Sequence, residues 1–223
     1  MALFLATRQA RPVPLRILDL LAPPTCWSCG GAVHLAAPLC PACASALTWI
    51  AGGGRAPRTR GIDHCCAPLA LTGPARDLVH ALKFRDAPAV AQLMAAHIVH
   101  ALPVGLPDPR ATLVPVPPHP GRRRRRGYDH ADALAEALAV RTGCPCLRVL
   151  VRAGGAAARQ RGRGRAARLA GAGLTITATG PPPARCVLVD DVRTTGATLQ
   201  ACAWALRAAG ARHVDAVAYA QAP

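Results

Sequence analysis

The most constraining part of this sequence lies near its C-terminus, where elements of different type follow one another at close spacing. Residues 186–189 are apolar and predict a buried strand, residues 190–196 predict a loop, and residues 197–209 predict a helix ended by Gly210. A second strand is expected at residues 214–219. Strand, helix and strand at this spacing indicate parallel pairing, so the sequence predicts an α/β fold with a mainly parallel sheet flanked by helices.

The loop between the first strand and the helix has the chemistry of a phosphate site. Free backbone N–H groups and the helix dipole favour an anion at a helix start, glycine permits close approach, and threonine hydroxyls add donors. Two acids before the turn can accept hydrogen bonds from sugar hydroxyls or bind Mg²⁺. An ordinary capped helix is the alternative, but the coincidence of acids with Thr-Thr-Gly favours binding. The candidate residues are Asp190, Asp191, Thr194, Thr195, Gly196, Ala197 and Thr198.

The same segment resembles a known motif. Residues 187–198 read VLVDDVRTTGAT, which closely resembles the phosphoribosyl pyrophosphate (PRPP) motif of type I phosphoribosyltransferases. The resemblance implies that the two acids contact the ribose hydroxyls, that residues 194–198 wrap the 5′-phosphate, and that Mg²⁺ accompanies PRPP. It also implies a pyrophosphate loop at residues 118–128, with Arg126 and Lys83 as candidates for charge pairing to the diphosphate. No residue is assigned as catalytic.

Further segments resemble the competence protein F (ComF) family. These are LKF at residues 82–84, VPVP at 114–117, RGYDHA at 126–131, and Gln160 followed by Arg168. Asp129 and His130 stand where much of that family has Asn-Gln. The resemblance implies a phosphoribosyltransferase-like protein with an N-terminal zinc-binding module, linked to DNA uptake in natural transformation and to the DNA-uptake machinery as a partner.

Four cysteines near the N-terminus have metal-ligand spacing. Cys26 and Cys29 form one Cys-x2-Cys pair, and Cys40 and Cys43 form a second pair ten residues later. Four thiolates at this spacing can surround one Zn²⁺ tetrahedrally, so a structural zinc is expected here rather than buried free thiols. The other six cysteines lack this spacing and are interpreted as small apolar residues.

The chain is strongly basic, which bears on its partners. Lys and Arg number 27 against 11 Asp and Glu, a formal charge of +16, and five arginines follow one another at residues 122–126. A second arginine-rich stretch, at residues 154–173, is expected to be a mobile loop or hairpin. These arginines could form a track for single-stranded DNA or a solvated loop with some charges facing PRPP; aromatic residues for base stacking are scarce.

Two functions therefore stay open at this stage. One is transfer of a phosphoribosyl group from PRPP to an unidentified acceptor. The other is a non-catalytic helper that binds or processes single-stranded DNA and keeps the fold as sensor or scaffold. No run approaches the roughly 18 apolar residues that span a bilayer, so no membrane span and a cytoplasmic location are expected.

The order of segments predicts three parts. Residues 1–50 would form the zinc-binding module, residues 51–64 a linker containing AGGGRAP, and residues 65–223 the phosphoribosyltransferase-like domain. Within the last part we expect mostly helix up to residue 102 with Asp77 and Lys83 facing outward, a strand at 112–116, a helix from Asp129 to a stop at Gly143, and a weaker strand at 148–152.

Overall fold

The computed structural model describes residues 24–33, 37–55, 59–84, 87–103, 107–118, 129–152 and 175–223. The arginine run at 122–126, which includes the pyrophosphate candidate Arg126, and the stretch at 154–173 lie outside the described residues. The sequence-based expectations for these two segments stay predictions.

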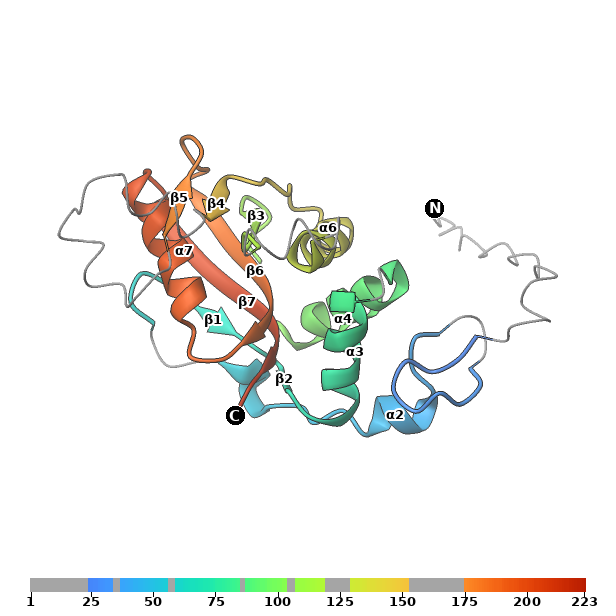
Figure 1. The fold of residues 1–223 in the computed structure, drawn as a ribbon. Coiled ribbons are helices and arrows are strands. Elements are labelled where there is room, and N and C mark those ends of the chain that lie inside the picture. Colours follow the sequence, from blue (N-terminus) through green and yellow to red (C-terminus); the bar gives the residue numbers. More distant parts are fainter. Residues whose placement is uncertain are drawn as a thin grey trace, which may run out of the picture.

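The centre of the described fold is a parallel sheet of five strands (Figure 1). The strand order is β1, β7, β6, β3. Strand β2 pairs with β7 on the same side as β1, further along β7. All of these pairings are parallel. The strands are β1 (Cys65–Cys66), β2 (Leu69–Ala70), β3 (Thr112–Pro115), β6 (Arg185–Arg193) and β7 (His213–Gln221). The predicted α/β class with a mainly parallel sheet is confirmed.

Helices cover both faces of this sheet, and the alternation of side chains along β6 shows which helices cover which face. Val187 and Val189 belong to the apolar core formed with α3 (Gly73–Phe84), α4 (Pro88–Ala101) and α6 (His130–Thr142). Cys186 and Leu188 point to the opposite face and pack in the core formed with α7 (Ala197–Ala208). A small antiparallel hairpin of β4 (Leu150–Arg152) and β5 (Ile176–Ala178) joins the second layer.

The ends of α6 are those that the sequence predicts. The Asp129 side chain accepts a hydrogen bond from the backbone N–H of Ala131 at 3.1 Å and caps the helix. Gly143 ends it with a φ of 73°, in the left-handed region where glycine pays no steric penalty. The Asp129 cap fixes the residue at which α6 begins and therefore the position of its first turn.

Strand β6 is longer than predicted, and this corrects the expectation of a loop at residues 190–196. The strand continues through both acids to Arg193, because β7 offers partners along its whole length: Asp190 is in register with Ala218 and Arg193 with Gln221. The turn is therefore reduced to three residues before α7. Aspartate is disfavoured in strands, so local propensity placed the boundary too early, and tertiary pairing overrides it.

The N-terminal module packs against the α/β layers. Its residues Cys26, Val33, Leu39 and Leu47 are buried in the same apolar core as α3 and α4. It contains the short helix α2 (Pro41–Ser45), and the 3-10 helix η1 (Ala51–Gly54) follows. Antiparallel bridges then join Trp49 to Leu69 and Arg55 to Cys66. The domain limits at residues 50 and 64 stay a prediction.

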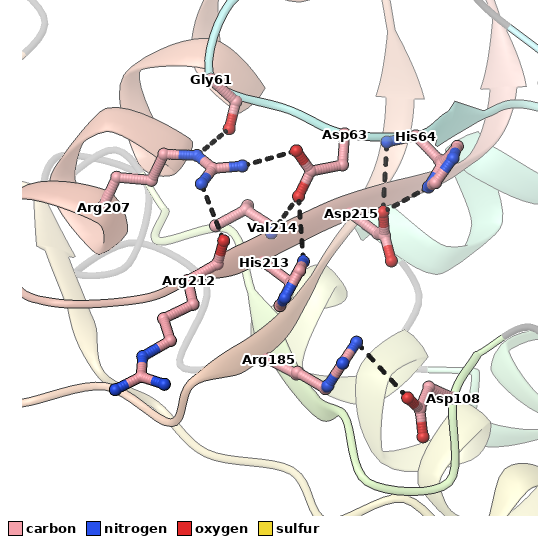
Figure 2. Close-up of polar contacts among 10 residues, drawn as sticks. All are labelled: Gly61, Asp63, His64, Asp108, Arg185, Arg207, Arg212, His213, Val214 and Asp215. Atoms are coloured by element: carbon pink, nitrogen blue, oxygen red, sulfur yellow. Dashed lines mark hydrogen bonds and ion pairs between the residues drawn. The ribbon is translucent and has the colours of Figure 1, made fainter.

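A polar network holds the segment before β1 at the end of the sheet where the strands begin (Figure 2). The Asp63 carboxylate accepts hydrogen bonds from Arg207 Nη2 at 2.7 Å and from the backbone N–H of Val214 at 2.9 Å. His64 contacts Asp215 with its Nδ1 at 3.0 Å. These contacts lie where β7 begins, at the opposite end of the strands from the acids of β6.

No helix within the described ranges has the length and apolarity to cross a membrane.

Two neighbouring glycines of η1 provide a test of this packing. A Cβ at Gly54 would lie 1.8 Å from the carbonyl oxygen of Ala67, whereas a Cβ at Gly52 would meet nothing within 4 Å. Both residues have positive φ. We expect Gly52→Ala to lower the free energy of unfolding by about 1 kcal/mol and Gly54→Ala by more than about 3 kcal/mol, in urea titrations. Equal losses would contradict the close contact between η1 and the segment joining β1 and β2.

Candidate functional site

Two clusters of chemically reactive side chains stand out in the described part of the chain. In the first, the four sulfur atoms of Cys26, Cys29, Cys40 and Cys43 all lie within 4.8 Å of one another. Gly30, with a φ of 74°, closes the turn after the first pair, and its N–H donates to the carbonyl of Cys26 at 2.9 Å. Cys40 caps α2, so the second pair stands on the first turn of that helix.

The geometry of these thiols fits one tetrahedral zinc ion. Cys29 Sγ and Cys40 Sγ are 3.7 Å apart, close to the edge of roughly 3.8 Å expected for a tetrahedron with Zn–S bonds of about 2.3 Å. Burial opposes ionisation of Cys26, but hydrogen bonds from the backbone N–H groups of Cys29, Cys40 and Ser28 lower its pKa to about 6. Burial and the neighbouring thiols instead raise the pKa of Cys43 to about 12, and a bound Zn²⁺ would deprotonate all four thiols, as coordination requires. The four cysteines are suited to hold a structural Zn²⁺.

The second cluster lies at the carboxyl end of β6, where two consecutive acids face different layers. Asp191 has the same parity as Val187 and Val189, so its side chain points into the layer of α3 and α6. Asp190 leaves the strand toward α7. On that side the pKa of the Cys202 thiol is raised, mainly by burial and next by the charge of Asp190. The two side chains leave the strand on opposite faces, but at its carboxyl end one oxygen of each lies within 4.8 Å of the other.

Asp191 is buried and faces two basic side chains. The residue is 3% exposed, Lys83 Nζ lies 2.9 Å from its Oδ2, and His130 Nε2 lies 3.6 Å from the same atom. Oδ2 nevertheless accepts no hydrogen bond, because the Lys83 contact has the distance of an ion pair without the angles of a hydrogen bond. Lys83 was expected to face outward; instead it lies at the end of α3 against this carboxylate.

Asp190 is in an environment that opposes its charge. Burial of the carboxyl raises its pKa well above the usual range, and the neighbouring Asp191 charge raises it further. The backbone N–H of Asp191 donates to Asp190 Oδ1 at 2.9 Å and acts in the opposite direction, as does the charge of Lys83. Part of the residue still reaches the surface. The free protein therefore holds the proton of this carboxyl tightly, and a cation brought by a ligand would favour its charged form.

The turn after β6 leads directly into α7. Thr194 and Thr195 are exposed, and Gly196 takes a φ of 77° immediately before the helix. The N–H of Ala197 has Thr195 Oγ1 at 3.4 Å, a long contact that an anion could replace. The first-turn amides of α7 have no acceptor within the helix. Donor groups and exposed hydroxyls thus collect beside the acids.

The structure brings together most, but not all, of the residues that the sequence singled out. Lys83 lies against Asp191, while Arg126 lies outside the described residues. His130 is not among the candidates from the sequence, because it has no metal-ligand spacing to another histidine. The signal was its place directly after the capping residue Asp129, since the first turn of α6 meets the carboxyl end of β6.

Comparisons with known proteins address the N-terminal module most directly. Residues 17–55 match the family of the double zinc ribbon domain, a stretch that contains all four clustered cysteines. A zinc-binding module at the N-terminus is therefore supported by both sequence and geometry. No curated protein matches the chain.

A solved structure is similar to part of this chain. It is described as the "structure of the allosteric regulatory enzyme of purine biosynthesis" and matches with a TM-score of 0.41 and 20% sequence identity. The match covers 63% of this chain and 30% of that one, so this chain spans less than a third of its length. A likeness at this level does not define the fold, which rests on the strand order and pairing described above.

The zinc cluster makes a direct prediction. Purified protein should contain about one Zn²⁺ per chain, and Cys29→Ser should remove most of it because a tetrahedral site needs all four thiolates. Since Cys26 is part of the core shared with α3, the melting temperature should fall by at least about 4 °C. Mass spectrometry of the metal and thermal melts measure both. Cys146→Ser, which changes a partly buried cysteine outside the cluster, should change neither; zinc retained by Cys29→Ser would refute the ligand set.

Replacement of the two acids should change the free energy of unfolding in opposite directions. Because the folded state raises the pKa of Asp190, the fold binds its proton more tightly, and stability is lost as pH rises from about 4 through the raised value. Asp190→Asn should therefore increase the free energy of unfolding at pH 7.5, by an amount that shrinks toward pH 4.5. Asp191→Asn removes the partner of Lys83 and should cost about 1–3 kcal/mol.

Urea titrations at the two pH values measure these differences. Destabilisation by both variants at pH 7.5 would show that the Asp190 charge is satisfied within the fold.

Proposed function

We propose that this chain binds PRPP at the carboxyl edge of its parallel sheet and acts as a phosphoribosyltransferase-like protein. The observation that carries the proposal is the junction of β6 and α7. There, two acids at a strand end, a three-residue turn with two exposed threonines, and the start of a helix meet within nine residues. Ligands of open α/β sheets bind at this edge of the strands.

Each part of the junction matches one part of the ligand. The amides of the first turn of α7, with the hydroxyls of Thr194, Thr195 and Thr198, provide donors for the 5′-phosphate. A Cβ at Gly196 would meet no atom within 4 Å, so space exists above this backbone. Asp190 and Asp191 supply acceptors for the ribose hydroxyls. The resemblance of residues 187–198 to the PRPP motif assigns these same roles.

The diphosphate of PRPP would lie on the side of Lys83. The Lys83 ammonium reaches Asp191 from the end of α3. The Lys83 side chain is 23% exposed, so it can turn toward solvent. Arg126 is the second proposed partner, and Mg²⁺ bound with PRPP would neutralise further charge on the diphosphate. Cations beside the leaving group favour its departure, because they stabilise the charge that develops there.

The proposed reaction needs little covalent chemistry from the protein. An acceptor forms a bond to the anomeric carbon while the bond from that carbon to the diphosphate oxygen breaks, and the diphosphate leaves with the electron pair. The chain's own residues hold the phosphate, fix the ribose and stabilise the diphosphate. The acceptor is not identified by any described side chain, and no catalytic base is assigned.

The wider role follows from the family resemblance. The ordered segments shared with the ComF family support a link to DNA uptake in natural transformation, in the cytoplasm and with the uptake machinery as a partner. The formal charge of +16 supports a second candidate, a non-catalytic helper for single-stranded DNA. The two candidates share the proposed sugar-phosphate site and differ in whether turnover occurs.

Binding of PRPP tests the proposal. Isothermal titration calorimetry in the presence of Mg²⁺ should show binding to the wild-type chain, and Asp190→Asn should weaken it by about 10- to 100-fold, since a hydrogen bond to a charged group is worth roughly 1.5–3 kcal/mol. Because Asp190→Asn is expected to stabilise the fold, a loss of PRPP affinity in this variant would not come from unfolding. Thr195→Ala should also weaken binding.

The matched control is Thr179→Ala, which changes an exposed threonine after β5, outside the junction. It should leave the affinity unchanged. Wild-type affinity in Asp190→Asn would refute the assigned site. Absence of PRPP binding, together with single-stranded DNA binding whose log affinity falls with log salt at about −0.7 per neutralised phosphate, would favour the second candidate.

A further inference from the structure

We propose that His130, Asp190 and Asp191 form a binding site for a divalent transition-metal ion, held by the protein itself before any sugar phosphate arrives. The inference deepens the proposed function and rests on it for the ligand, because the ion would lie beside the same acids, but its observations are contacts of the protein alone. One donor atom from each of the three side chains lies within 4.8 Å of the other two. Two come from the end of β6 and one from the first turn of α6.

The strongest indication is the buried oxygen of Asp191. The side chain is 5% exposed, and its Oδ2 is in contact with no hydrogen-bond donor of suitable geometry. The Lys83 ammonium offsets the charge of this oxygen, but the hydrogen-bond positions of the oxygen stay open to an ion or a water. A metal ion between this oxygen, the Asp190 carboxylate and the His130 imidazole would satisfy it.

Lys83 shows that the position attracts a cation. Its Nζ is 2.9 Å from Asp191 Oδ2 and offsets the buried charge, but without a hydrogen bond that would fix it in place. The lysine is the second-last residue of α3, and its side chain is partly exposed. An arriving divalent ion repels the ammonium, which turns toward the solvent side. The ion thereby frees Lys83 for the diphosphate, so that one binding event prepares the next.

The donor set indicates which ions fit. One imidazole nitrogen and two carboxylates are a mixed set that suits Mn²⁺ and other transition ions, whereas Mg²⁺ strongly prefers oxygen. Three protein ligands leave coordination positions for water or for ligand hydroxyls. The zinc cluster differs in all its donors, since four thiolates select a softer ion. The two sites should therefore load independently.

Titration of zinc-loaded, full-length protein with Mn²⁺ in the absence of PRPP tests the inference. Mn²⁺ does not displace Zn²⁺ from thiolates, and electron paramagnetic resonance of free Mn²⁺ reports how much is bound. We expect about one Mn²⁺ per chain, bound more tightly than Mg²⁺. His130→Ala should weaken Mn²⁺ binding at least about tenfold, since it removes a direct ligand.

Lys83→Ala supplies a prediction of the opposite sign. Removing the competing ammonium should tighten Mn²⁺ binding at least about fivefold, an outcome that misfolding cannot produce. His100→Ala, which changes an exposed histidine of α4, should leave the affinity unchanged. No saturable Mn²⁺ binding in both wild type and Lys83→Ala, or equal affinity in wild type and His130→Ala, would overturn the inference. PRPP binding without Mn²⁺ binding would refute the metal site alone, and the reverse would refute the proposed function alone.

Discussion

Parallel pairing of β6 with β7 on one side and β3 on the other is the constraint on which the described structure depends. Eight of the nine residues of β6 have partners in this pairing, and four of them form an uninterrupted buried apolar run. Burial on both faces is what such a run requires, and it is met by one layer of helices on each side. Because β7 keeps pairing to Gln221, the two acids are carried rigidly on the strand instead of on a loop.

Helix α3 connects the N-terminal module to the end of that strand. At its middle, the hydroxyl of Ser28 donates to Asp77 Oδ2 at 2.7 Å, and near its end Lys83 contacts Asp191. The buried residues of the module share one apolar core with this helix. The thiolate cluster and the acid pair are thus joined by a single helix of twelve residues, and the module supports the layer from which Lys83 reaches the sheet.

Much of this arrangement could be predicted from local patterns. Asp129 and Gly143 marked the ends of α6, and the apolar runs marked β3, β6 and β7, because capping and burial are encoded within a few neighbouring residues. The length of β6 could not be predicted in this way, since it depends on pairing with β7. The inward turn of Lys83 and the approach of His130 to Asp191 are equally contacts between distant segments, which spacing along one chain does not encode.

The opposite directions of Asp190 and Asp191 have a consequence for the shape of any molecule that touches both. Side chains of neighbouring strand residues emerge on opposite faces, yet one oxygen of each acid lies within 4.8 Å of the other at the strand end, so such a molecule must sit at the rim of the sheet. A compact ring with vicinal hydroxyl groups meets this requirement. A long planar compound that lies within one layer, away from the rim, would not meet both acids.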